Sequence, residues 1–141
     1  MLCNPDGGLA LSVDPAATAQ RLVTVSHSLS DPMQLWDAQI VFDRNTTEPL
    51  GLALINHYSG LALRGNLDNS PVSQIPAQDV DQFAFWEFAP SNEYAVIRLA
   101  ERRAQNLTAD PGATAGLPVT IADWRGGLPD YSQVWLIYES A

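Results

Sequence analysis

Residues 132–138 read SQVWLIY, and two earlier stretches, MQLWDAQIV at residues 33–41 and FAFWEFA at residues 83–89, have the same alternating apolar character. Each stretch contains one tryptophan. Trp36, Trp86 and Trp135 follow one another at intervals of 50 and 49 residues in a chain of 141. A large apolar residue at each third of a chain predicts three similar units that share one core, because each unit then supplies an equivalent side chain to it.

A second element recurs in register with the tryptophans. The stretches NPDGGLALSV, residues 4–13, and NHYSGLALRG, residues 56–65, share an asparagine, a glycine four residues later and the sequence Leu-Ala-Leu. A third copy reads YAVIRLAERRAQNLTAD at residues 94–110 and precedes the last tryptophan. These repeats predict a single domain with lobes at approximately residues 1–47, 48–92 and 93–141.

The rest of the chain indicates short strands rather than helices. The 10 prolines and 9 glycines are spread along it, and few windows keep apolar residues at helical spacing. About twelve apolar or alternating runs, bounded by turn residues, lie near residues 1–4, 9–13, 21–27, 35–42, 51–57, 61–65, 71–75, 85–89, 94–100, 106–109, 118–123 and 134–139. Four strands in each of three lobes predict one closed barrel, since a propeller with blades of this size normally needs more than three.

Three lobes that carry these two elements resemble the ricin-B-type β-trefoil lectins, whose lobes contain a QxW motif, and the resemblance covers essentially the whole chain. Gln34 and Gln133 keep the glutamine of this motif, whereas Ala84 replaces it in the second lobe. The resemblance implies an all-β fold, a β-trefoil of twelve strands in three pseudo-symmetric lobes. We expect the QxW tryptophans to fill the core and the glutamines to bind neighbouring backbone, so that both are structural.

Charge limits the partners of this protein. The 16 acidic residues and 7 basic residues, all arginines, give a net charge of -9. Nucleic acid would be repelled, because binding to its phosphates requires clustered lysine and arginine. The only local basic cluster is Arg98, Arg102 and Arg103, and Glu101 interrupts it. A neutral partner is therefore favoured.

The sequence also limits location and covalent chemistry. Cys3 is the only cysteine, so an internal disulfide is excluded. The apolar runs are too short for membrane insertion, and the first residues show no basic segment followed by an apolar core. We expect a cytoplasmic protein, or one that is secreted without a classical signal peptide.

No pattern in the sequence predicts catalysis, a metal or another cofactor. His27 and His57 fall in different lobes and flank no nucleophile signature. Histidine and cysteine spacings typical of a metal site are absent. We expect a protein that is not an enzyme and needs no cofactor.

The resemblance implies one possible shallow sugar site in each lobe. An aspartate directly after the second strand accepts hydrogen bonds from sugar hydroxyls, and an aromatic residue of the next strand stacks on the ring. The aspartate position holds Ser12, Arg64 and Thr108, which departs from the pattern for galactose. Two residues further on, the lobes carry Asp14, Asn66 and Asp110. These residues either form Asx-type turns, as the prolines after both aspartates favour, or replace the missing acceptor.

Lobe three offers the best stacking residue. Trp124 lies outside the QxW register, in the Gly-rich stretch DWRGGLPDY at residues 123–131. It either serves as a platform for a sugar or caps the open end of the barrel. We predict a carbohydrate site formed by Asp110, Trp124, Asp123, Arg125 and Tyr131. A weaker second site in lobe one would use Asp14 and His27.

Two functions follow from these features. The first is a non-catalytic lectin whose partners are glycans or glycoconjugates. The alternative is a protein-binding trefoil such as a protease inhibitor, which would use the loops RGGLPDY at residues 125–131 and LDNSPVSQIPAQDVDQ at residues 67–82. The sequence leaves open which sugar is bound, how many lobes are active and whether the protein forms a homodimer.

Overall fold

The computed structural model describes residues 1–4, 9–13, 22–26, 31–66, 70–91, 93–109, 118–126 and 130–138. Over these ranges the regular elements are β-strands and single 3-10 turns, so the predicted all-β class is confirmed. The strands are β1 Leu2–Asn4, β2 Leu9–Val13, β3 Leu22–Ser26, β4 Trp36–Phe42, β5 Pro49–Asn56, β6 Leu61–Arg64, β7 Ser73–Pro76, β8 Trp86–Ser91, β9 Tyr94–Leu99, β10 Asn106–Thr108, β11 Thr120–Ala122 and β12 Leu136–Ile137. The turns are η1 Pro32–Gln34, η2 Ala77–Asp79 and η3 Gln82–Ala84. In the described part of the chain, no helix has the length and apolar character needed to cross a membrane.

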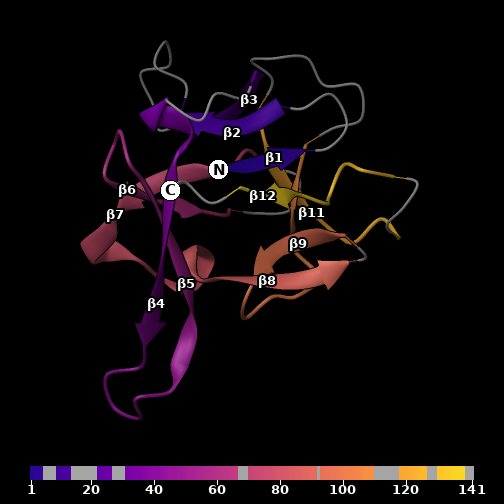
Figure 1. The fold of residues 1–141 in the computed structure, drawn as a ribbon. Coiled ribbons are helices and arrows are strands. Elements are labelled where there is room, and N and C mark those ends of the chain that lie inside the picture. The colour runs from indigo at the N-terminus through magenta and orange to yellow at the C-terminus, as the bar shows by residue number, and fades with distance from the viewer. Residues whose placement is uncertain are drawn as a thin grey trace.

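The strands form two antiparallel sheets (Figure 1). One sheet has the order β12-β1-β2-β3, and the other runs β11-β10-β9-β8-β5-β6-β7, with β4 joined to β5. The pairs β2–β3, β6–β7 and β10–β11 are hairpins within successive thirds of the chain. The pairs β4–β5, β8–β9 and β1–β12 link one third to the next. Each third of the chain is thus joined to both others by strand pairing.

The tryptophans that end each third make the same hydrogen bond. The indole N–H groups of Trp36, Trp86 and Trp135 donate to the backbone carbonyls of Leu11, Leu63 and Leu107, at 3.2, 3.0 and 3.1 Å respectively. All three acceptor leucines are fully buried. A buried indole needs a partner for its N–H, and here each tryptophan ties the last strand of its third to the second.

Burial of the three tryptophans is not equal. Trp86 and Trp135 are 0% exposed. Trp36 packs against the same core but is less completely covered than the other two, being partly buried. Trp36 lies at the start of β4, which among the described strands pairs with β5 alone and is mostly exposed along its length.

An aspartate lies five residues before each of these three tryptophans and begins a turn, which the sequence motifs did not predict. The carboxylates of Asp31, Asp81 and Asp130 accept the backbone N–H groups of Met33, Phe83 and Ser132, at 2.9, 3.0 and 2.9 Å respectively. Two of these turns are η1 and η3. Because a carboxylate that accepts the N–H two residues on fixes the start of a turn, each aspartate sets the approach of the chain to its tryptophan.

The turn at Asp130 gives a prediction about acid stability. Hydrogen bonds from Ser132, from its hydroxyl and then its backbone N–H, lower the pKa of Asp130 from its ordinary value of 3.8, and Arg125 adds to the shift. A lowered folded-state pKa contributes stability above the unfolded pKa, and this contribution is lost as pH falls through the folded pKa. We expect the Asp130→Asn variant to lose less unfolding free energy than the parent protein between about pH 5 and pH 2, as measured by urea unfolding.

The control for this comparison is Glu48→Gln at the tip of the β4–β5 hairpin, which changes the net charge equally. If Asp130→Asn and the parent protein lose the same unfolding free energy on acidification, the turn does not contribute in this way.

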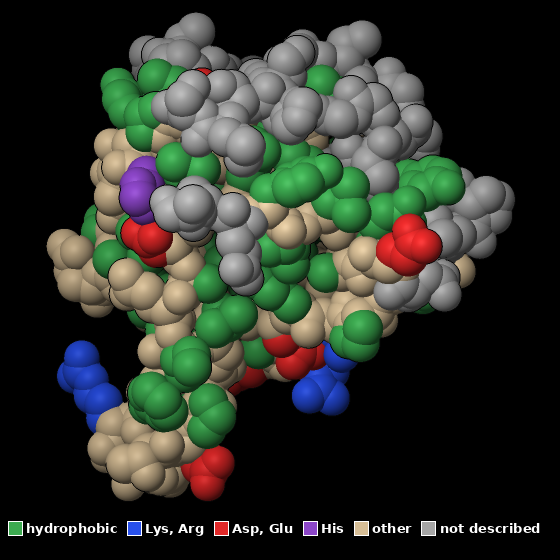
Figure 2. Space-filling view, in the orientation of Figure 1, with side chains coloured by type: hydrophobic (Ala, Val, Ile, Leu, Met, Phe, Trp, Pro, Cys, Tyr) green, Lys and Arg blue, Asp and Glu red, His purple; other side chains and the backbone are tan. Residues whose placement is uncertain are grey.

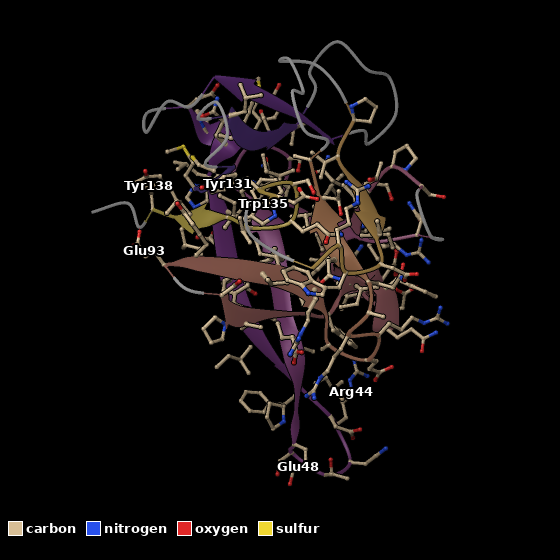
Figure 3. The ribbon with its side chains drawn as sticks, turned by 90° about the vertical axis from the view of Figure 1, so that its right-hand side faces the viewer. Arg44, Glu48, Glu93, Tyr131, Trp135 and Tyr138 are labelled. Atoms are coloured by element: carbon tan, nitrogen blue, oxygen red, sulfur yellow. The ribbon has the colours of Figure 1, made fainter. Side chains whose placement is uncertain are left out.

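The β4–β5 hairpin projects from the rest of the molecule (Figure 1). Arg44 and Glu48 lie at its tip, far from Tyr131 and Trp135 (Figure 3). Hydrophobic side chains gather on this projection (Figure 2). Ile40 and Phe42 belong to β4 and are 60% and 55% exposed.

Candidate functional site

Trp124 forms one wall of a cavity of about 300 Å³. The indole is 44% exposed, the largest exposure of any described tryptophan. The other lining residues are Ala89, Pro90, Ser91, Val96, Arg98, Arg103 and Asn106. The cavity therefore combines an accessible aromatic face with hydrogen-bonding side chains.

Strand pairing brings these residues together. In β8 and β9, Ala89 lies opposite Val96. Asn106 of β10 pairs with Arg98 of β9 on one side and with Ala122 of β11 on the other. Trp124 comes two residues after the end of β11. The cavity thus lies between the end of the third hairpin and the β8–β9 pair.

The QxW glutamine of this third of the chain holds the segment that carries Trp124. The side-chain N–H of Gln133 donates to the carbonyl oxygen of Asp123 at 2.8 Å, and its side-chain oxygen accepts the backbone N–H of Arg125 at 2.8 Å. The same side chain also donates to Thr108 Oγ1 at 3.1 Å and to Ala122 O at 3.3 Å. Both neighbours of Trp124 are therefore fixed by one buried amide, and the expected role of the glutamine is confirmed here.

Two guanidinium groups and one carboxylate set the charge beside the cavity. The Nε atoms of Arg98 and Arg103 both lie near Oε1 of Glu87, at 2.6 and 3.0 Å. The side chain of Arg103 is 70% exposed and that of Arg98 is 31% exposed. Among the described residues that line the cavity, the charged ones are Arg98 and Arg103, and both are paired with Glu87 behind the wall.

Of the other residues predicted for the lobe-three site, the described ones, Asp123, Arg125 and Tyr131, do not line this cavity with Trp124. Asp123 is exposed, and its carboxylate accepts the side-chain N–H of Gln105 at 2.8 Å. Arg125 donates to Ser132 Oγ at 3.2 Å. The ring of Tyr131 packs edge-on against Tyr94, with centroids 5.9 Å apart. Asp110, and the lobe-one pair Asp14 and His27, lie outside the described residues, so their roles stay predictions.

The structure also shows what replaces the missing aspartates. Ser12 and Thr108 are buried and donate to the backbone carbonyls of Val13 and Asn106, at 3.0 and 2.8 Å. Neither side chain is placed to bind a ligand at the surface.

In the second third of the chain, an ion pair occupies this position. Arg64 donates to Asp81 at 3.2 and 3.3 Å and to Asn66 at 2.6 Å, and its guanidinium lies 5.1 Å from the centre of the Phe83 ring. Asn66 also donates to the carbonyl of Pro71 at 2.9 Å. The Asn66 side chain is thus engaged by Arg64 and Pro71, and the Asx-type turn predicted for this residue stays a prediction.

A second cavity of about 380 Å³ lies beside Trp36. Asp37, His57 and Tyr138 contribute polar groups to its wall, and His57 Nε2 lies 3.0 Å from Asp37 Oδ1. Trp36 is one of the residues that line this cavity. Trp36 in this second cavity is less exposed than Trp124 is in the first cavity.

Comparison with known proteins identifies the fold. No family model and no curated protein sequence matches the chain. Among solved structures, the designed three-fold symmetric protein ThreeFoil is 20% identical, with 95% of this chain and 93% of that chain covered and a TM-score of 0.74. The BEL beta-trefoil is 13% identical, with 95% and 87% covered and a TM-score of 0.69. The C-terminal domain of an earthworm lectin, a mutant in complex with 6'-sialyllactose, is 15% identical, with 96% and 93% covered and a TM-score of 0.61.

These likenesses show that the chain has a β-trefoil fold. At such low identity they define the architecture alone, because one fold carries many unrelated functions.

Proposed function

We propose that this protein is a ricin-B-like lectin that binds glycans at the Trp124 cavity without catalysis. The observation that carries the proposal is the accessible indole of Trp124 on a cavity wall that also holds hydrogen-bonding side chains. A sugar ring presents an apolar C–H face and a rim of hydroxyls, so it needs an aromatic surface and directional polar groups together. Ser91, Arg98 and Arg103 supply polar groups beside this surface.

Preorganisation supports the same proposal. The backbone on both sides of Trp124 is bound by Gln133, so the platform does not have to be ordered when a ligand binds. A rigid site loses less conformational entropy on binding than a mobile one. One structural neighbour is a lectin domain bound to a glycan, which supports a glycan as the kind of partner without identifying it.

We further propose that the chain is one domain of three pseudo-symmetric lobes, at approximately residues 1–47, 48–92 and 93–141, with twelve strands. The recurrence of the tryptophan–leucine hydrogen bond and of the aspartate turn in each third supports this division. Among the described residues, the lobes differ at the positions where the family would bind a sugar. Lobe three has the open aromatic, whereas in lobe two the Arg64–Asp81 ion pair fills the position where the family aspartate would act.

A glycan array tests the function directly. We expect the labelled protein to bind a restricted set of glycans, with single-site dissociation constants of about 10 μM to 1 mM, since a shallow cavity buries little surface. Binding should survive a chelator, because no metal takes part in the proposed contacts. Binding that is abolished by a chelator and restored by calcium would contradict the proposed mode, and an array with no signal would contradict the function.

The protein-binding alternative is favoured by one observation, the projecting β4–β5 hairpin with Ile40 and Phe42 exposed (Figure 2). Exposed apolar residues that gather on a projection mark a surface for another protein. This element differs from the two loops that the sequence had suggested. A protease inhibitor would form a stoichiometric complex, visible by size-exclusion chromatography, and would be indifferent to added sugar.

A further inference from the structure

We propose that the Trp124 cavity selects an acidic sugar, a pyranose that carries a carboxylate, over its neutral counterpart. This inference rests on the proposed lectin function and adds the class of ligand. It is carried by Arg98 and Arg103, which line the same cavity as the exposed indole.

The placement of these arginines is unusual for this chain. The protein has only 7 basic side chains against 16 acidic ones, and two of the basic ones line this single cavity. Glu87, which contacts both guanidinium groups, is not among the lining residues. The described residues of the cavity wall therefore carry positive charge and no negative charge, within a protein of net charge -9.

The geometry leaves donors for a ligand. Each guanidinium contacts Glu87 through its Nε, at 2.6 Å for Arg98 and 3.0 Å for Arg103. The terminal N–H groups of a guanidinium form the paired hydrogen bonds that match the two oxygens of a carboxylate. Arg103, whose side chain is 70% exposed, has the freedom to turn toward a bound anion.

Charge and stacking together favour an acidic sugar. Hydrogen bonds between a guanidinium and a carboxylate are stronger than those between a guanidinium and a neutral hydroxyl, which competes poorly with water. The Trp124 face requires a ring with an apolar side, which a small inorganic anion lacks. The negative charge of the rest of the protein acts over longer distances, where salt screens it, whereas the contact with Arg103 is direct.

The test uses ligand pairs that differ only at C6, where one member has a carboxylate and the other a CH2OH group: methyl glucuronide against methyl glucoside, and methyl galacturonide against methyl galactoside. We expect the full chain to bind the acid of at least one pair about tenfold or more tightly than its neutral partner, by calorimetry or NMR titration. Arg103→Gln should reduce this ratio to near one, while the melting temperature stays the same because the side chain is mostly exposed. Glu87→Gln should raise affinity for the acid, since it removes the competing carboxylate.

Arg102→Gln is the matched control. It removes the same charge one position away, but Arg102 lies over the Phe83 ring at 4.9 Å and does not line the cavity. We expect it to keep the preference for the acid.

The possible outcomes separate this inference from the lectin function. Equal binding of acidic and neutral sugars, lost in Trp124→Ala, would overturn the acidic preference and leave the lectin function standing. No binding of any sugar would overturn both. An aspartate-rich peptide that binds as tightly as the acidic sugar, with no loss in Trp124→Ala, would show that the cavity takes acidic peptides instead.

Discussion

The Trp135→Ala variant should lose about 3–5 kcal/mol of unfolding free energy, and Trp86→Ala a similar amount. Both indoles are 0% exposed and belong to the same core cluster. Truncation would leave a large cavity and would also leave the carbonyl of Leu107 or Leu63 without the indole donor. Typical domains are stable by about 5–15 kcal/mol, so the loss is a large share of the total.

Urea or guanidinium unfolding measures this effect, and two further variants make the comparison sharper. Trp36→Ala should cost less, because this indole is only partly buried. Trp135→Phe should retain most of the packing and lose about 1–3 kcal/mol, chiefly from the buried carbonyl left unpaired. Equal losses for Trp36→Ala and Trp135→Ala would show that the core is not filled as described.

The Trp124→Ala variant should abolish detectable glycan binding and leave the melting temperature nearly unchanged. The indole is 44% exposed, and the neighbouring backbone is held by Gln133 rather than by the indole itself. The parent site should have a dissociation constant of about 10 μM to 1 mM. A tenfold or greater loss of affinity raises this constant to about 100 μM to 10 mM, most of which is too weak for ordinary binding assays. Array signal and calorimetry measure the binding, and thermal unfolding measures the stability.

Tyr58→Ala provides the control for loss of an exposed aromatic residue. Tyr58 is 58% exposed in the turn after β5 and lines neither cavity. It should bind glycans as the parent protein does. If Trp124→Ala binds normally, or if it unfolds, Trp124 caps the barrel and the proposed site is wrong.

Most of the architecture could be predicted because it is repeated. The tryptophan spacing and the Leu-Ala-Leu element each mark a strand in successive thirds, and alternating residues identify strands locally. The aspartate turn carried the same signal, since Asp31, Asp81 and Asp130 recur in step with the tryptophans. The partial exposure of Trp36 could not be predicted from the repeat, because it depends on how β4 is paired in the sheet, where β5 is its neighbour among the described strands.

Only part of the candidate site could be predicted from the sequence. Trp124 stood out because it falls outside the repeat. Its partners in the cavity come from elsewhere in the chain: Arg98 reaches it through the pairing of β9 with β10 and of β10 with β11. Such register is set by turns and core packing together, so the basic cluster at residues 98–103 could be seen in the sequence but not assigned to Trp124.

The pairing of β1 with β12 has a consequence for how the protein is made. The amino group of Met1 donates to the carbonyl of Tyr138 at 2.7 Å, across 137 positions of sequence, and Tyr138 returns a backbone hydrogen bond to Met1. During synthesis, β12 leaves the ribosome long after β1, so the edge of β1 that pairs with β12 stays open until then. Contacts between residues so distant in sequence form slowly, and an unpaired strand edge invites association with other chains. Nascent chains of this protein should therefore depend on chaperones until β12 has emerged.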